Sequence, residues 1–136
     1  MPDAVWDLSD EEYESQVRID SDKCIYQDKH FLRGVAYIPI KDCVESFGWG
    51  VWVEVDESDF FNYMKKYDQD NSNEPVFIGL IANEIPKHEN TLGLKVEVQL
   101  GDEDQRPTLT VKDKQHQLYT DQRLGITLEK VHQIDG

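Results

Sequence analysis

Basic residues are scarce in this sequence. It holds 14 Lys and Arg against 28 Asp and Glu in 136 residues, which gives a formal net charge of −14. A protein of this charge repels phosphate groups, so nucleic acid is not an expected partner. Anionic membrane surfaces are disfavoured for the same reason. The composition instead favours a partner that carries positive charge.

Long apolar runs are missing as well. No stretch approaches the roughly 20 apolar residues that a membrane-spanning helix needs. The first seven residues contain neither the basic nor the apolar segment of a signal peptide. Cysteine is equally sparse, and Cys24 and Cys43 form neither a CxxC pair nor a disulfide framework. We therefore expect a soluble, reduced protein in the cytoplasm, with no membrane partner.

No established catalytic or metal-binding motif is present. The sequence contains no GxSxG, HExxH, GxGxxG or P-loop segment. A zinc site needs about four ligands, often in close pairs, whereas Cys24, Cys43, His30 and His116 are scattered along the chain. The acidic segment 68–74 lacks the Gly and Glu that a calcium loop requires at its sixth and twelfth positions. We predict no cofactor and no metal. Cys24 is expected in the core and Cys43 in a polar loop.

The chain nevertheless has enough apolar material to fold. Its length suits one domain, residues 1–136, and the content of Phe, Trp and Tyr, 10%, argues against disorder. Apolar spacing, caps and turn residues predict helices at 9–16, 57–67, 118–124 and from 127 onward, and strands at 23–26, 31–40, 47–53, 76–82, 94–100 and 107–111. This order predicts an α+β fold, with a mostly antiparallel sheet of about five to six strands packed against helices.

The strand at 47–53 is unusual because glycine alternates with bulky residues. Gly48, Gly50 and Trp52 share one face, which is left nearly bare. Another backbone, an aromatic side chain or a ligand must pack against that face. One interpretation is a core strand covered by the following helix. The other is a pocket, whose candidate lining residues are Trp49, Trp52, Asn83, Glu84, His116 and Arg123.

Two further segments carry specific expectations. The helix at 57–67 places an aromatic stripe on the sheet, made of Phe60, Phe61, Met64 and Tyr67. The run at 76–82 is apolar on both faces, as is typical of a central strand covered on both sides.

Acidic residues gather in two loops, after the helix at 57–67 and before the strand at 107–111. Carboxylates in such loops steer a protein onto a basic partner. We predict that the partner-binding residues are Asp68, Asp70, Glu74, Asp102, Glu103 and Asp104.

Several segments resemble the bacterial DUF2199 family of domains of unknown function. The likeness is carried by 47–53, 77–86, 91–95, 106–107 and 116–127, and it extends over most of residues 18–134. The resemblance implies one compact domain of similar size and no established enzymatic activity. Many members carry a cysteine pair ahead of this region that would suit zinc. The sequence lacks that pair, so no metal role and no catalytic residue is carried over.

The sequence is compatible with three functions. The first is a non-enzymatic, acidic protein-binding domain, most concretely an immunity protein that neutralises a bacterial toxin with a basic surface by blocking its active site. The second is a small-molecule-binding or enzymatic domain with a pocket beside Gly48 and Gly50. The third is a housekeeping homo-oligomer. The sequence does not give the oligomeric state.

Overall fold

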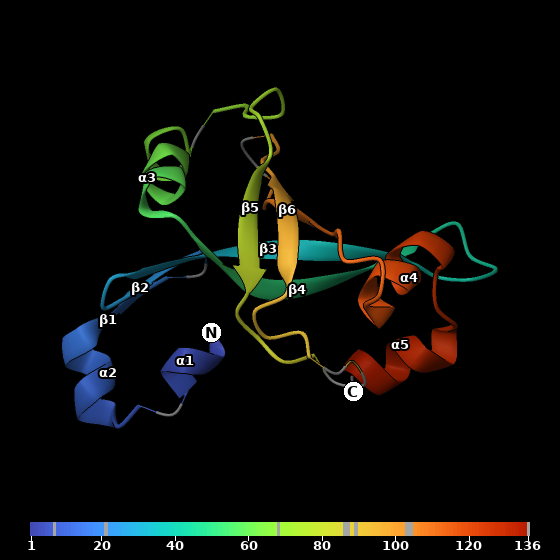
Figure 1. The fold of residues 1–136 in the computed structure, drawn as a ribbon, viewed down its shortest axis with the longest axis horizontal. Coiled ribbons are helices and arrows are strands. Elements are labelled where there is room, and N and C mark those ends of the chain that lie inside the picture. Colours follow the sequence, from blue (N-terminus) through green and yellow to red (C-terminus); the bar gives the residue numbers. More distant parts are fainter. Residues whose placement is uncertain are drawn as a thin grey trace.

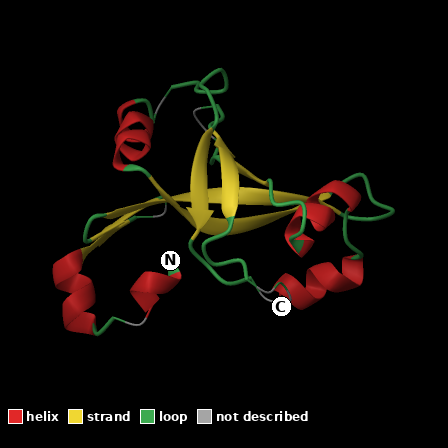
Figure 2. Cartoon of the chain, viewed as in Figure 1, coloured by secondary structure: helices red, strands yellow, loops and turns green. Residues whose placement is uncertain are grey.

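Strands of the protein form a small closed barrel, and the helices lie around it (Figures 1 and 2). The computed structural model describes residues 1–6, 8–20, 22–67, 69–85, 88, 90–102 and 105–135. In this part of the chain the helices are α1 (Asp3–Trp6), α2 (Asp10–Gln16), α3 (Glu57–Lys65), α4 (Gln117–Leu124) and α5 (Leu128–Asp135). The strands are β1 (Val17–Ile19), β2 (Lys23–Tyr26), β3 (Lys29–Pro39), β4 (Ser46–Val55), β5 (Phe77–Ile81), β6 (Lys95–Gln99) and β7 (Thr108–Val111). The α+β class is confirmed.

The sheet is mixed, so the expectation of a mostly antiparallel sheet of five to six strands is wrong. Strands β1 to β7 are neighbours in chain order, and each successive pair is antiparallel. An additional parallel pairing joins Val35 of β3 to Thr108 of β7 and closes β3–β7 into a barrel. Four direction reversals separate β3 from β7, so these two strands run the same way and can close the barrel only in parallel.

The barrel interior is the main hydrophobic core. Alternate residues of β3 and β4 point into it, and Leu32 lies directly opposite Val53. Gly34 faces the same interior, where an added Cβ would lie 2.8 Å from the side chain of Leu109. The predicted strands at 94–100 and 107–111 are confirmed, with Val96, Val98, Leu109 and Val111 buried.

The face of β4 that carries Gly48 and Gly50 is filled by side chains of β3. An added Cβ would lie 2.9 Å from the Arg33 guanidinium at Gly50 and 3.2 Å from the Tyr37 ring at Gly48. The interpretation that the following helix covers this face is therefore wrong. Trp52 lies further along the same face in a second hydrophobic cluster, with Val5, Cys24, Phe31 and Ala82.

Helix α3 does not lay its whole aromatic stripe on the sheet. Phe60 and Tyr63 are buried, but Phe61, Met64 and Tyr67 are 47%, 38% and 41% exposed. Consecutive residues are about 100° apart around a helix, so the side that buries Phe60 turns Phe61 away from the barrel. The sequence prediction was wrong on this point, and the helix has a partly apolar outer surface.

Strand β5 is likewise open on one side. Ile81 is buried, whereas Ile78 is 54% exposed and Val76, just before the strand, is 47% exposed. The predicted double covering of this strand is wrong. An apolar run identifies a strand here but does not establish that both of its faces are covered.

The helix boundaries were well predicted from local signals. Ser9 forms a capping box with Glu12 at the start of α2, at the predicted beginning of the helix at 9–16. Gly125 ends α4 with a φ of 84°, and the Thr127 hydroxyl accepts a hydrogen bond from the Lys130 backbone N–H at the start of α5. The short elements α1 and β1 were not predicted. No helix in the described part of the chain is both long and apolar enough to span a membrane.

The two cysteines should react very differently with an alkylating reagent. Cys24 is fully buried, and burial raises the pKa of its thiol to about 11, whereas Cys43 is exposed. The thiolate is the reactive form, so only Cys43 should be labelled in the native protein at about pH 8. Mass spectrometry should find one label before unfolding and two after. Rapid labelling of Cys24 in the native protein would contradict the buried position of β2.

Candidate functional site

An apolar groove lies beside α3 and is the first candidate site. It has a volume of about 320 Å³, and its apolar lining is Ile19 of β1, Ile25 of β2, and Phe60 and Met64 of α3. We call it the α3 groove. Phe61 stands next to it on the helix, packed edge-on against Phe60 with the ring centroids 5.4 Å apart. Partly exposed aromatic and Met side chains around a groove are typical of protein interfaces.

Charged groups also line the α3 groove. Arg18, Asp20 and Lys23 complete its lining. Burial raises the pKa of Asp20, but hydrogen bonds from the backbone N–H groups of Asp22 and Lys23, together with the Lys23 charge, outweigh burial and leave the pKa below its ordinary value. Asp20 therefore stays ionised at neutral pH.

The first turn of α3 adds further negative charge. It carries Glu57 and Asp59 and follows Asp56 at the N-cap. Burial raises the pKa of Asp59, and repulsion from Asp56 raises it further. Carboxylates at a helix N-terminus are stabilised by the helix dipole, so the charge here has a local structural role as well.

The two acidic loops predicted to bind a partner lie side by side. The backbone N–H of Asn71 donates to the carbonyl oxygen of Gly101 at 3.0 Å, and the Gln99 side chain donates to the Ser72 and Glu74 carbonyls. The structure thus brings Asp70, Glu74 and Asp102 to one end of the barrel. Asp68, Glu103 and Asp104 lie outside the described residues.

These loop carboxylates are not equally available to a partner. Glu74 forms an ion pair with Lys66, which offsets its charge. Asp70 is exposed, and hydrogen bonds from the Ser72 hydroxyl and backbone N–H hold the pKa of its carboxyl below the ordinary value. The Asp102 backbone N–H donates to the Gln105 side chain at 3.3 Å. Asp70 is the clearest candidate of the three for an electrostatic contact.

The six residues of the alternative pocket lie in different places. Trp49 packs on the barrel core, whereas Trp52 lies on the opposite face of β4. Asn83 accepts a hydrogen bond from the Trp52 backbone N–H at 2.8 Å, and Glu84 accepts one from Thr91. In α4, the Arg123 guanidinium stacks over the Tyr119 ring at 4.6 Å, and His116 caps the helix.

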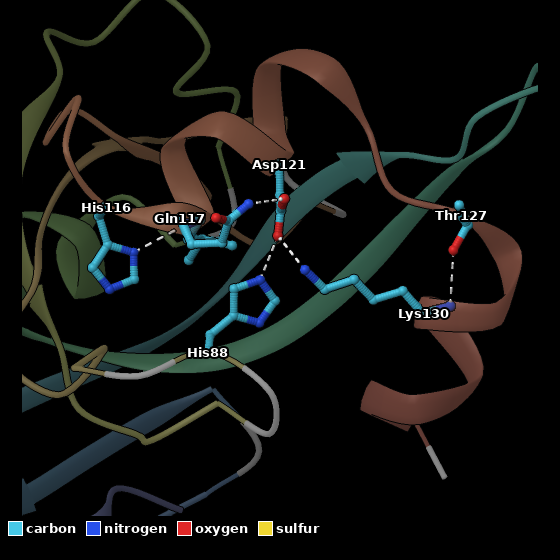
Figure 3. Close-up of polar contacts among 7 residues, drawn as sticks. His88, His116, Gln117, Asp121, Thr127 and Lys130 are labelled. Atoms are coloured by element: carbon cyan, nitrogen blue, oxygen red, sulfur yellow. Dashed lines mark hydrogen bonds and ion pairs between the residues drawn. The ribbon is translucent and has the colours of Figure 1, made fainter.

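A buried polar cluster joins the β5–β6 connection to α4 and α5 (Figure 3). His88 Nε2 lies 2.5 Å from Asp121 Oδ2, and their side chains are 0% and 6% exposed. Because a carboxylate only accepts hydrogen bonds, the proton of this contact is on His88. Gln117 donates to the other Asp121 oxygen at 2.9 Å, and Lys130 Nζ donates to Oδ2 at 3.1 Å.

The cluster keeps Asp121 ionised. Burial raises the pKa of its carboxyl, but the hydrogen bonds from Gln117, His88 and Lys130 outweigh burial and hold that pKa below its ordinary value. A carboxylate paired with an imidazole is an arrangement that general acid–base catalysis also uses. Here the imidazole is fully buried and does not reach a dissolved substrate in this conformation, so the contacts support a structural link.

His116 reinforces the same link. Its Nδ1 accepts a hydrogen bond from the Leu118 backbone N–H at 3.0 Å, and its Nε2 donates to the Asn90 carbonyl at 3.2 Å. The sequence had singled out His116 but missed His88, Gln117 and Lys130. The spacing of Gln117 and Asp121, four residues apart on one helix, was a usable signal. Nothing local marked His88, whose partners are distant in sequence.

Among the residues that the structure describes, no three Cys, His, Asp or Glu side chains are grouped so that they could hold a metal ion.

A family model described as "Uncharacterized protein conserved in bacteria (DUF2199)" matches residues 1–126. No match was found among curated proteins or among solved structures.

Proposed function

The chain belongs to the DUF2199 family of bacterial proteins, and we propose that it acts by binding another protein and not by catalysing a reaction. The observation that carries this proposal is the outer surface of α3. Phe61 and Met64 are 47% and 38% exposed there, beside the α3 groove. A partner that buries these side chains gains roughly 25 cal/mol for each Å² of apolar surface removed from water.

Charge defines the kind of partner that would bind. The protein has a net charge of −14. Asp20, Asp56, Glu57 and Asp59 lie on or beside the helix that presents Phe61. A basic surface with apolar anchors would be complementary to this arrangement, because the carboxylates would speed encounter and the apolar groups would hold the complex.

The most specific form of the proposal is an immunity protein of the bacterial cytoplasm. Toxins that act on nucleic acids need basic clefts to bind phosphates, and a carboxylate-rich surface would compete for such a cleft. The protein would then neutralise a toxin by covering its active site. The acidic loops at Asp70 and Asp102, which contact each other near α3, would extend the same binding face.

Site-specific crosslinking in the bacterium that encodes the protein tests the surface. A photoreactive phenylalanine analogue replaces Phe61 in one variant and Leu124 in the other. Leu124 is a matched control because it is 71% exposed on α4. We expect the probe at position 61 to capture one basic protein that the probe at position 124 does not. Capture only of a second copy of this chain would favour the homo-oligomer, and the same products from both positions would contradict the proposal.

Titration with the purified partner then measures how much Phe61 contributes to binding. Phe61→Ser should weaken binding by about 30-fold, which corresponds to a hot-spot contribution of about 2 kcal/mol. Leu124→Ser should leave the affinity unchanged. Association should also slow as salt is added, since screening weakens the attraction between opposite charges. Equal affinities for the wild type and Phe61→Ser would rule out α3 as the interface.

Co-expression separates the immunity function from protein binding in general. The captured partner should stop growth when it is expressed alone, and growth should return with the wild-type protein but not with Phe61→Ser. A partner that is harmless alone would leave protein binding in place and remove the immunity function.

A further inference from the structure

A second pocket lies on the outside of the sheet, under α1. It has a volume of about 350 Å³ and shares no lining residue with the α3 groove. Its apolar lining includes Phe31 of β3, Leu80 of β5, and Ala82 and Leu92 of the segments that follow β5. Three charged residues, Asp3, Lys29 and Glu54, also line this pocket. We call it the α1 pocket.

The strand register explains how these groups come together. Glu54 of β4 lies directly opposite Phe31 of β3 on one side and Leu80 of β5 on the other. Residues opposite each other in neighbouring strands project from the same face of the sheet. Lys29 is two residues from Phe31 on β3 and therefore shares that face. The Glu54 carboxylate and the Lys29 ammonium group thus stand on the face of the sheet that also carries Phe31 and Leu80.

The wall of the pocket is held in place by hydrogen bonds. The Asp3 backbone N–H donates to the Ala82 carbonyl at 2.8 Å. The Asp3 carboxylate accepts hydrogen bonds from the Asn83 side chain at 3.2 Å and from the Glu84 backbone N–H at 2.8 Å. These contacts fix the start of α1 against the end of β5, so the pocket exists before any ligand arrives.

The charges of Lys29 and Glu54 are not held by ion pairs in the described part of the chain. Neither Lys29 nor Glu54 forms an ion pair with any residue of the described part of the chain. The hydrogen bonds to the Asp3 carboxylate come from neutral groups, so its negative charge adds to that of Glu54. Lys29 and Glu54 remain available to form ion pairs with a ligand. A ligand that carries both charges could satisfy them together.

We propose that the α1 pocket binds a free α-amino acid with an apolar side chain. The ligand carboxylate pairs with Lys29, its ammonium group pairs with Glu54, and its side chain packs against Phe31, Leu80 and Leu92. The volume is at the small end of the range of about 300–1,000 Å³ for ligand sites, which suits a molecule of this size. A zwitterion has no net charge, so the strongly acidic protein does not repel it as it would an anion.

Calorimetric titration of the full chain tests the site, with L-leucine and L-phenylalanine as probes. We expect saturable binding of at least one of them. Isopentylamine lacks the carboxylate of leucine, and 4-methylpentanoic acid lacks its ammonium group. Each should bind at least about 5-fold more weakly than leucine if both charges are recognised.

Variants place the binding in the α1 pocket. Lys29→Gln and Glu54→Gln should each weaken amino-acid binding by at least about 5-fold. Lys114→Gln is the matched control, because Lys114 is an exposed cation between β7 and α4 that does not line the α1 pocket. Circular dichroism of each variant checks that the fold is intact.

Three results would overturn the proposal. They are the absence of saturable binding up to about 10 mM amino acid, equal binding of leucine and isopentylamine, or binding that survives both Lys29→Gln and Glu54→Gln. The proposal does not depend on the α3 surface, because Phe61→Ser should leave amino-acid binding unchanged.

Discussion

Replacing Asp121 with alanine is expected to lower the free energy of unfolding by about 3–5 kcal/mol. The Asp121 carboxylate accepts hydrogen bonds from His88, Gln117 and Lys130, and its side chain is 6% exposed. Removing it leaves the fully buried His88 ring without this acceptor and Lys130 without its counter-charge. A buried donor that loses its partner incurs the whole cost of desolvation, which is why this effect should be large.

Urea unfolding followed by fluorescence measures the loss. Glu129→Ala is the control, because Glu129 is an exposed carboxylate near the start of α5 and should change stability by no more than about 0.5 kcal/mol. A loss below about 1 kcal/mol for Asp121→Ala would mean that the cluster does not hold the β5–β6 connection against α4.

The Asp121 carboxyl should also make the free energy of unfolding depend on pH. Its pKa in the folded protein lies below the ordinary value of 3.8, so the unfolded chain binds the proton more tightly. The stabilisation is therefore complete above the unfolded pKa and is lost as the pH falls through the folded pKa. Asp121→Asn should lose this part of the acid dependence below about pH 4. An unchanged pH profile in the variant would contradict the assigned role.

The sequence predicted local structure better than the way elements meet. The capping box at Ser9 and the glycine that ends α4 are decided by residues only a few positions apart. The barrel closure depends on Val35 meeting Thr108, a contact between residues far apart in sequence. Hydrophobic alternation defines the inner face of each strand but carries no information on which distant strand lies next to it.

At the candidate sites too, the sequence predicted local features better than contacts between elements. Two acidic loops could be read directly from composition, but their contact through Asn71 and Gly101 could not. The outward turn of Phe61 depends on how α3 is rotated on the barrel, and an aromatic-rich helix has more than one plausible buried face. His88 was missed because its partner Asp121 lies on α4, far away in sequence. The same Asp121 carboxylate also binds Lys130 of α5.

The two proposed sites use different residues of the molecule. The α3 surface uses the exposed parts of Phe61 and Met64. The Phe61 ring also contacts Phe60 and His30, so the stability of Phe61→Ser is checked beside its affinity. The α1 pocket uses charges on β3 and β4 that project from the outer face of the barrel. Because neither site includes the Asp121 cluster, loss of stability in Asp121→Ala and loss of binding in Phe61→Ser are independent measurements.

Gly125→Ala is the second substitution with a large expected effect, a loss of about 2–5 kcal/mol. Gly125 has a φ of 84°, which an L-residue adopts only under strain, and an added Cβ would lie 2.8 Å from the Pro39 carbonyl oxygen. That oxygen accepts the hydrogen bond from the Ile126 N–H that ties the α4–α5 link to the end of β3. The clash is with backbone, so relief requires the link itself to move.

Gly93→Ala is a comparison variant that lacks that clash. Gly93 has the same φ of 84°, but nothing lies within 4 Å of its added Cβ. Its substitution should therefore cost only the backbone strain, about 1–2 kcal/mol. In urea unfolding, Gly125→Ala should therefore lose more stability than Gly93→Ala, because it adds the contact with the Pro39 backbone to the strain. Equal losses of unfolding free energy in the two variants would mean that the α4–α5 link can shift freely. In that case the contact between Pro39 and Ile126 would not hold the two C-terminal helices at this end of the barrel.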